Sequence, residues 1–475
     1  MTPEEFRKAG HQLIDWIADY REQIETMPVR AQVNPGDVRS QLPVQPPEDP
    51  VGIDQLLEDL NSAIIPGITQ VQHPMHFGWF PSNASLASVL GDIASSGLGT
   101  LGISWESCPA LTELETVVCD WLRQLTGLSS QWQGTIHDTA STACLTALMV
   151  AREQASAYSQ NRGGLQAETS PLIVYSTAEA HSSITKSALL AGFGIDNLRF
   201  VDFDQGTRAM SASALRLAIE QDIDNNLRPA AIVASVGSTG VTAIDPVAEI
   251  AEIANEYGIW LHIDAAMAGS AMLLPECRHL WDGVENADSI CWNPHKWMGT
   301  ILDCSLFYVK DPEMLIRVMS TNPSYLQSTV DDKVVQYRDW GIPLGRRFRA
   351  LKLWFHLRLD GPDAIRQRLR RDLDNANWFA DQVINTEHWQ VVAPVNLQTV
   401  CILHRPPGIE GDDLDAHTLS WVNRINQSGA AFMSASQLDG RWMVRVSIGV
   451  ESTTREHVEA LWELIRKTVS HCEER

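Results

Sequence analysis

The chain has 475 residues, of which 44% are hydrophobic and 20% charged, a composition typical of a globular protein. Acidic residues outnumber basic ones, 59 to 36, and a formal net charge of −23 argues against nucleic acid or an anionic membrane as a partner. No stretch approaches the roughly 18 consecutive apolar residues of a membrane helix. Residues 1–10 lack the basic flank and apolar core of a secretory signal. The length predicts two or three domains.

The first 50 residues predict a helix followed by an extended arm. Thr2, Pro3 and Glu5 form a capping box with proline at the first helical position. Apolar residues then recur at helical spacing along one face of the helix. The proline-rich stretch 42–50 cannot continue regular structure. A helix with one apolar stripe and a following arm suggests packing against a partner subunit.

From about residue 110 onward, short apolar runs alternate with helical patterns. This alternation is typical of a mostly parallel sheet covered by helices. In such sheets ligands bind where the carboxyl ends of the strands meet helix N-termini. The predicted strands lie at 171–176, 198–202, 230–237, 259–264 and 288–293. Helices are predicted at 112–127, at 139–154 with threonine and serine caps, at 182–194 and at 245–258.

The last third of the chain begins with a predicted long amphipathic helix at 345–361 and then becomes α+β. The expected elements are strands at 389–392, 399–406 and 441–450 and a closing helix at 454–472. We therefore expect an N-terminal helical dimerisation segment at 1–83, a large cofactor-binding domain at 84–360 and a small C-terminal domain at 361–475.

The spacing of the cysteines in the sequence indicates neither a disulfide framework nor a metal site. They lie at Cys108, Cys119, Cys144, Cys277, Cys291, Cys304, Cys401 and Cys472, with no CxxC pair and no spacing typical of a metal site. Most stand among apolar residues, which is typical of small core side chains in a reducing compartment. We expect a cytoplasmic protein that holds no metal.

Two of the predicted strands end at side chains that could take part in catalysis. Asp264 closes the run 259–264, and Lys296 follows the run 288–293. Taken alone, the carboxylate would be a turn cap and the lysine a residue of the rim. If the two strands are neighbours, both groups face one crevice. Pyridoxal 5'-phosphate (PLP) needs such a pair, a lysine for its aldehyde and an acid that keeps its ring nitrogen protonated.

A phosphate group would also need a cradle, and the segment 138–143 offers one. Its small hydroxyl residues open a helix, where backbone N–H groups and the helix dipole can receive an anion. Asn293 could reach the same phosphate. His181 follows another strand and begins a helix, where it would by default be structural. Each feature is weak alone, but all of them fall at one edge of the predicted sheet.

Seven segments occur in the order of a known family: FPSNASLASVLGD, SWESCPALTELE, HIDAAMAGSA, NPHKW, DCSLFYVKD, TNPSYLQ and RDWGIPLGRRFRALKLWF. By these segments the chain resembles the group II PLP-dependent amino-acid decarboxylases, most closely the bacterial aromatic-L-amino-acid (DOPA) decarboxylases. The resemblance implies a fold-type-I α/β enzyme with a mostly parallel central sheet, an N-terminal helical dimerisation arm and a small α+β C-terminal domain. It also implies an obligate homodimer with the substrate pocket at the subunit interface.

The resemblance implies a role for each matching position. Lys296 would form the Schiff base with PLP, Asp264 would hold the ring nitrogen, and His181 would stack on the ring. The other cofactor contacts would come from Ala140, Ser141, Thr239, Ala266, Asn293 and His295. The substrate pocket would be formed by Trp79, Phe80, Pro81, Ser82 and Gly345, with Leu101 and Ile103 from the other subunit.

The resemblance also implies the reaction. Tyr325 matches the family's loop tyrosine, which would protonate the α-carbon after CO2 leaves. Related aldehyde synthases carry phenylalanine there, or asparagine in place of the stacking histidine, whereas this chain keeps Tyr325 and His181. We expect an aromatic amine as the product, from DOPA, tyrosine, phenylalanine, tryptophan or 5-hydroxytryptophan.

Several alternatives stay open at this point. An aldehyde synthase, or a decarboxylase of histidine or glutamate, would share most of these segments. The pocket segment 76–105 contains no Lys or Arg to pair with an acidic substrate side chain, and Gly345 leaves more room than the serine of histidine-selective relatives. A non-catalytic binding protein should have lost Lys296, Asp264 or Tyr325, and the chain has all three.

Overall fold

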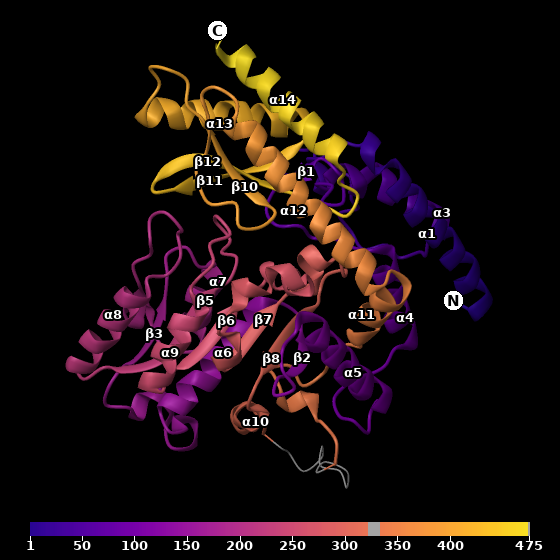
Figure 1. Ribbon diagram of the computed structural model, residues 1–475. Helices are drawn as coiled ribbons and strands as arrows, with labels where there is room; N and C mark the ends of the chain where they lie inside the picture. The colour runs from indigo at the N-terminus through magenta and orange to yellow at the C-terminus, as the bar shows by residue number, and fades with distance from the viewer. Residues whose placement is uncertain (322–332, 474–475) are drawn as a thin grey trace. The chain divides into compact units, whose positions relative to one another are not determined.

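The computed structural model describes residues 1–321 and 333–473 (Figure 1). The chain forms two compact units. The first unit comprises Met1–Pro81, Trp378–Gln390 and Ile402–Arg475, and the second comprises Ser82–Asn377 and Val391–Cys401. The domain limits expected from the sequence remain a prediction.

The second unit is built on a seven-stranded sheet with the order β2-β8-β7-β6-β5-β3-β4 (Figure 1). The strands β7, β6, β5, β3 and β4 pair in parallel, whereas β8 runs antiparallel to both β7 and β2. The bounds are β2 Gln133–His137, β3 Leu172–Ser176, β4 Leu198–Phe200, β5 Arg228–Ser235, β6 Trp260–Asp264, β7 Ser289–Trp292 and β8 Ser305–Val309. The predicted α/β class and the five predicted strands are confirmed.

The strands β2 and β8 were not expected from the sequence. In β2, the residues Gly134, Thr135 and His137 interrupt the apolar run, although all of them are buried. Gly134 is required by packing, because a Cβ there would lie 2.5 Å from the ring of Tyr308 on β8. These two strands close the sheet on the side of β7.

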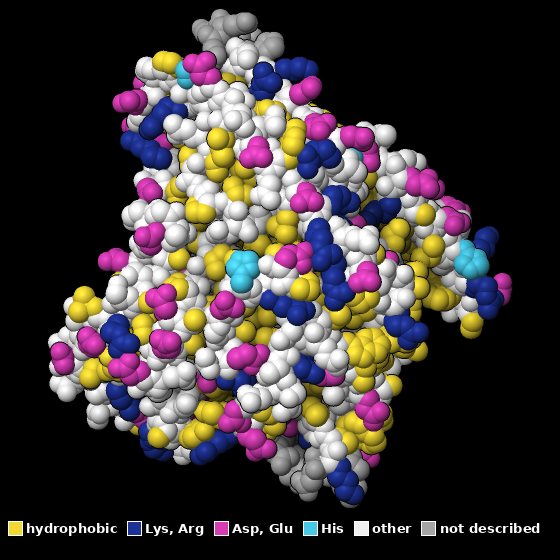
Figure 2. Space-filling model, viewed as in Figure 1, with side chains coloured by type: hydrophobic (Ala, Val, Ile, Leu, Met, Phe, Trp, Pro, Cys, Tyr) yellow, Lys and Arg dark blue, Asp and Glu magenta, His cyan; other side chains and the backbone are white. Residues whose placement is uncertain are grey.

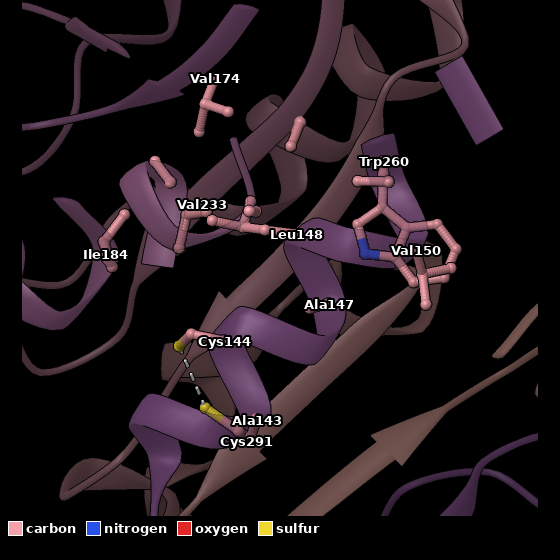
Figure 3. Close-up of a cluster of buried hydrophobic side chains, with 14 of the residues drawn as sticks. Ala143, Cys144, Ala147, Leu148, Val150, Val174, Ile184, Val233, Trp260 and Cys291 are labelled. Carbon is pink, nitrogen blue, oxygen red and sulfur yellow. Dashed lines mark hydrogen bonds between the residues drawn. The ribbon is translucent and has the colours of Figure 1, made fainter. Parts of the chain in front are cut away.

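The helix α6 (Ala140–Ala155) lies at the centre of the core of the second unit and contacts β5, β6, β7 and β8. Ala143, Cys144, Ala147 and Ala151 recur at helical spacing and are fully buried. Figure 3 shows this face of α6 beside Val233, Trp260 and Cys291 of the sheet. The small side chains let the helix lie close to the strands.

The remaining helices of this unit surround the sheet and its edges. They are α4 Leu86–Leu98, α5 Pro109–Thr126, α7 Ser182–Leu190, α8 Ala212–Asp224, α9 Val247–Tyr257, α10 Pro312–Met319 and α11 Ala350–Leu359. The helix α5 ends at Gly127, which adopts a left-handed conformation as the pattern predicts. The helix α12 (Pro362–Ile384) begins in the second unit and ends in the first.

Two details of the predicted helices are wrong. The expected helix at 345–361 is the ten-residue α11, because Arg346 is drawn away into an ion pair with Glu115 (2.6 Å) and its carbonyl accepts the N–H of Gly102. The expected side-chain cap of α6 is also absent. The side-chain oxygen of its N-cap residue, Thr139, accepts no backbone N–H of the first turn.

The first unit contains the N-terminal helix α1 (Pro3–Gln23). The predicted capping box is confirmed, since Thr2 Oγ1 accepts the N–H of Glu5 at 3.2 Å and a Glu5 oxygen accepts the N–H of Thr2 at 2.6 Å. No residue of α1 is buried, and Phe6 of its apolar stripe is 63% exposed. The proline-rich stretch 42–50 forms neither helix nor strand, as expected.

A five-stranded sheet with the order β1-β11-β12-β10-β9 lies mainly in the first unit. Its strands are β1 His76–Phe77, β9 Trp389–Val391, β10 Thr399–His404, β11 Phe432–Leu438 and β12 Arg441–Ser447. The other helices of this unit are α2 Asp37–Ser40, α3 Ile53–Asp59, α13 Gly411–Ser428 and α14 Arg455–Glu473. The predicted strands β9, β10 and β12 and the closing helix α14 are confirmed, whereas β1 and β11 were not expected.

The surface in view carries Asp and Glu side chains spread among Lys and Arg (Figure 2), in keeping with the acidic net charge of −23. Within the described residues, no helix combines the length and the apolar character needed to cross a membrane.

Several buried histidines of the second unit are neutral. Burial lowers the pKa of His137 to about 4 and that of His356 to about 3, from an ordinary value of 6.5. His356 Nδ1 shares a hydrogen bond with Thr300 Oγ1 at 2.9 Å. Because the unfolded chain binds more protons between these pKa values, stability is present above pH 6.5 and is lost as pH falls towards 3 or 4.

We expect His356→Gln to reduce this acid sensitivity. At pH 5 the wild-type protein should lose about 2 kcal/mol through this group relative to pH 7, and the variant should not. Denaturant unfolding at pH 7 and pH 5 measures the difference. The control is His279→Gln, at an exposed position, which should keep the wild-type loss. A wild-type loss in His356→Gln would contradict the prediction.

Candidate active site

Asp264 is the last residue of β6 and is 7% exposed. Its Cα partner on the neighbouring strand β7 is Cys291. The carboxylate oxygen Oδ1 accepts the N–H of Ala266 at 3.0 Å and lies 3.8 Å from Cys291 Sγ. The hydrogen bonds that Asp264 accepts from the described residues therefore all reach Oδ1, which leaves Oδ2 for a ligand.

Lys296 lies in the tight turn Pro294–Met298 that follows β7. Its backbone is not helical (φ −100°, ψ −112°), and its side chain is half-buried. Its N–H donates to the carbonyl of Asn293 at 3.0 Å, and the N–H of Asn293 donates to the carbonyl of Ala266 at 2.8 Å. The expectation that the strands before Asp264 and Lys296 are neighbours is thus confirmed, since β6 pairs with β7. A backbone hydrogen bond also joins the turn that contains Lys296 to the segment after Asp264.

His181 is the N-cap residue of α7, directly after the segment that follows β3. Its Nδ1 accepts the N–H of Ser183 at 3.2 Å and lies 2.7 Å from the Ser183 hydroxyl. A backbone N–H can only donate, so the neutral ring carries its proton on Nε2. Burial lowers the pKa of His181, the Asp264 carboxylate raises it, and the Lys296 ammonium lowers it. The ring is therefore within electrostatic reach of both groups.

The start of α6 presents unsatisfied backbone donors. Ala140 and Ser141 are its first two residues, and Thr139 supplies no side-chain cap. Ala140 is buried and Ser141 is exposed. Asn293 directly follows β7 and is 2% exposed. Its Oδ1 has no hydrogen-bond partner among the described residues.

Two further predicted cofactor residues lie on the turns that follow β5 and β7, the two strands on either side of β6. Thr239 is half-buried in the turn after β5. That turn needs glycine at position 237, where φ is +84° and a Cβ would lie 2.4 Å from the Cβ of Ala268. His295 is buried, and its Nδ1 accepts the N–H of Cys304 at 2.9 Å. Burial, with the nearby Lys296 ammonium, lowers the pKa of His295 to about 4.

Four predicted substrate residues lie in the second unit. Leu101 and Gly345 are neighbours, because a Cβ on the glycine would lie 3.9 Å from Leu101 Cδ1. Leu101 is 57% exposed. Ile103 is half-buried and donates its N–H to Ser107 Oγ. Ser82 is also half-buried. The structure brings three of the four, Leu101, Ile103 and Gly345, onto adjacent segments joined by the backbone bond from Gly102 to Arg346.

The other three predicted substrate residues, Trp79, Phe80 and Pro81, belong to the first unit. Trp79 is 52% exposed with a φ of +52°. Its N–H donates to Ser434 Oγ at 2.7 Å, and its ring packs on Phe432. Tyr325, the predicted proton donor, lies outside the described residues.

Sequence reasoning missed two groups of residues beside these positions. Ser183, which fixes the His181 tautomer, was not considered. A buried cluster of Cys144, His262 and Cys291 was also missed. It adjoins Asp264 through Cys291, whose Sγ lies 3.8 Å from Asp264 Oδ1. His262 could have been found, since residues two apart in a strand share a face of the sheet and Asp264 follows it by two.

The sequence matches the pyridoxal-dependent decarboxylase conserved domain over residues 35–404. It is 39% identical to the phenylacetaldehyde synthase of Arabidopsis thaliana, covering 99% of this chain and 97% of that protein. It is also 39% identical to tryptophan decarboxylase 2 of Oryza sativa subsp. japonica, with 98% and 95% covered.

Among solved structures, Oryza sativa TDC with PLP and tryptamine superposes with a TM-score of 0.96 at 34% identity, with 99% of each chain covered. This likeness confirms the predicted fold-type-I architecture. The chain belongs to the pyridoxal-dependent decarboxylases, and its cofactor is pyridoxal 5'-phosphate.

Proposed function

We propose that the protein removes the carboxylate of an aromatic L-amino acid as CO2 and releases the amine. The observation that carries the proposal is the convergence of Asp264, His181 and Lys296 at the carboxyl edge of the sheet. The relatives named above support the aromatic class of substrate.

The residues present fit the cofactor. The first turn of α6 has backbone donors that no side chain caps, and the buried Asn293 has a side-chain amide N–H that can donate to a phosphate oxygen. An uncapped helix start is a good receptor for a phosphate. Asp264 has a carboxylate oxygen to spare. When bound, PLP supplies an electron sink for the bond that breaks at the α-carbon.

Each residue of the site has a distinct task in this proposal. Asp264 Oδ2 holds a proton on the ring nitrogen of the cofactor, and its own position is fixed by the N–H of Ala266. Lys296 holds the cofactor through its Nζ. His181, neutral and protonated on Nε2, stacks on the ring and offers an N–H donor without adding a positive charge. Ala140, Ser141 and Asn293 hold the phosphate, and Thr239, Ala266 and His295 complete the cofactor contacts.

The reaction requires one proton at the α-carbon. When CO2 leaves, the electron pair of the broken bond stays behind, and the α-carbon takes up H+ to give the amine. We assign this proton to Tyr325. Trp79, Phe80, Pro81 and Ser82 are proposed to form the aromatic pocket. Leu101 and Ile103, with Gly345 beside Leu101, are proposed to reach it from a second subunit of a homodimer, which the exposure of Leu101 and of α1 supports.

A second candidate function is an aromatic aldehyde synthase, because the Arabidopsis phenylacetaldehyde synthase is as similar as the rice decarboxylase. The retention of His181 and Tyr325 favours the amine. We also propose a cytoplasmic location, which the absence of a disulfide among the seven described cysteines supports.

Product analysis tests the reaction. We expect the purified holoenzyme to convert at least one of DOPA, tyrosine, phenylalanine, tryptophan or 5-hydroxytryptophan into amine and CO2 in equal amounts, without peroxide. Histidine and glutamate serve as the comparison substrates. Tyr325→Phe should shift the product towards aldehyde, ammonia and peroxide with PLP still bound. Aldehyde from the wild-type protein would establish the second candidate, and amine alone from the variant would remove Tyr325 from its role.

Mass spectrometry tests the lysine. We expect borohydride reduction of the holoenzyme to leave a pyridoxyl group on the peptide that contains Lys296. Lys296→Ala should abolish both this label and the visible absorbance of bound PLP. The matched control is Lys186→Ala, an exposed lysine on α7, which should keep both. A label on any other lysine of the wild-type protein would contradict the assignment.

Proline substitution tests the phosphate cradle. Ala140→Pro removes one backbone donor at the first position of α6, where proline fits a helix. Thr139 is already extended (φ −137°, ψ 161°), as a residue before proline must be. We expect PLP to bind about tenfold more weakly, the free-energy equivalent of one charge-assisted hydrogen bond.

The control for this experiment is Ala212→Pro, at the first position of α8, whose cap Ser211 is also extended. It should bind PLP as the wild-type protein does. PLP dissociation constants from fluorescence titration give the comparison. Unchanged binding in Ala140→Pro would show that the phosphate lies elsewhere.

A further inference from the structure

Three soft donor atoms meet in the core of the second unit, away from solvent. They belong to Cys144 of α6, His262 of β6 and Cys291 of β7, each fully buried. Cys144 Sγ lies 3.3 Å from His262 Nε2 and 3.9 Å from Cys291 Sγ. Figure 3 shows the two sulfur atoms facing each other between the helix and the sheet. All three donor atoms lie within 4.8 Å of one another.

The backbone fixes this arrangement. His262 and Asp264 are two apart on β6, so both point to the same face of the sheet. The register pairs His262 with Ser289 and Asp264 with Cys291 on β7. The helix α6 packs on that face and brings Cys144 onto the pair of strands. The cluster is therefore a product of the fold, and the spacing of the cysteines along the chain does not reveal it.

The histidine is held by a second layer of polar groups. His262 Nδ1 lies 2.9 Å from Ser289 Oγ, and Ser289 Oγ accepts the indole N–H of Trp260 at 3.0 Å. This contact fixes the plane of the imidazole ring and turns Nε2 towards Cys144. Metal-binding histidines characteristically have their other ring nitrogen held in this way.

The two distances from Cys144 Sγ, 3.3 Å to His262 Nε2 and 3.9 Å to Cys291 Sγ, are close to those of a coordination sphere. Zinc–sulfur and zinc–nitrogen bonds of ordinary length place two ligand sulfurs about 3.8 Å apart, and a sulfur and a nitrogen about 3.6 Å apart, around a tetrahedral ion. We propose that Cys144, His262 and Cys291 form a binding site for a soft divalent cation such as Zn2+ or Cd2+. Two thiolates and one imidazole are ligands that such ions prefer. A carboxylate oxygen, Asp264 Oδ1, lies 3.8 Å from Cys291 Sγ and is a candidate fourth donor.

An ion in this site would inhibit the enzyme. Asp264 is the one member of the group with measurable exposure, at 7%. In the proposed function, the negative charge of the Asp264 carboxylate stabilises the protonated ring nitrogen of the cofactor. A cation bound beside Oδ1 competes with that nitrogen for the same charge. This consequence rests on the proposed function, whereas occupation of the site does not. The ion and the cofactor should therefore weaken each other's binding to the same extent.

Cadmium titration of the holoenzyme tests the site. We expect one Cd2+ per chain by equilibrium dialysis, together with the ultraviolet charge-transfer absorption of cadmium thiolates. Amine formation should fall in parallel and return when a dithiol chelator is added. Cys144→Ala and Cys291→Ala should lose the thiolate absorption, and Ser289→Ala should weaken Cd2+ binding about 10- to 100-fold as a loss of second-layer support.

The matched control is Cys119→Ala, which removes another buried thiol on α5 and should bind Cd2+ as the wild-type protein does. Absence of the thiolate absorption in the wild-type protein, or its persistence in both Cys144→Ala and Cys291→Ala, would overturn the site. Because the absorption does not depend on turnover, a protein that makes no amine before Cd2+ is added but still shows the thiolate absorption afterwards would refute the proposed function and leave the site standing.

Discussion

The pairing of β6 with β7 is the constraint on which the rest of the site depends. Its register sets Asp264 beside Cys291, and the strands then diverge into two turns. The backbone bond from Asn293 to Ala266 joins those turns again at 2.8 Å. An acid and a lysine from positions 32 residues apart are thereby held at one edge of a rigid sheet, which preorganises the two groups for a ligand.

Much of this arrangement could be predicted from the sequence. Continuous apolar runs ending in Asp264 and before Lys296 predicted the parallel strands, whereas the order of the strands in the sheet was not predicted. The polar strand β2 could not be found in this way, because Gly134 is buried by close packing against Tyr308 and the hydroxyl of Thr135 is buried in a hydrogen bond to Glu115. The start of α11 was misplaced because the long-range ion pair between Arg346 and Glu115 overrides local helical preference.

The side-chain contacts within the site were also beyond the sequence. The hydrogen bonds of Ser183 to His181 settle a tautomer, and a pattern of residue types carries no information about tautomers. The meeting of Cys144 with Cys291 depends on how α6 lies across the sheet, and 147 residues separate the two cysteines in the chain. Local signals place such residues on elements, and packing alone decides which of them touch.

The helix α6 serves both the cofactor and the core. Its first turn faces the phosphate in our proposal, and its remaining turns are buried among β5, β6, β7 and β8. A ligand that binds only the folded chain stabilises it by about 2.7 kcal/mol at a hundredfold excess over its dissociation constant. The lifetime of this protein in a cell should therefore follow the supply of vitamin B6, with cofactor-starved molecules unfolding and being degraded first.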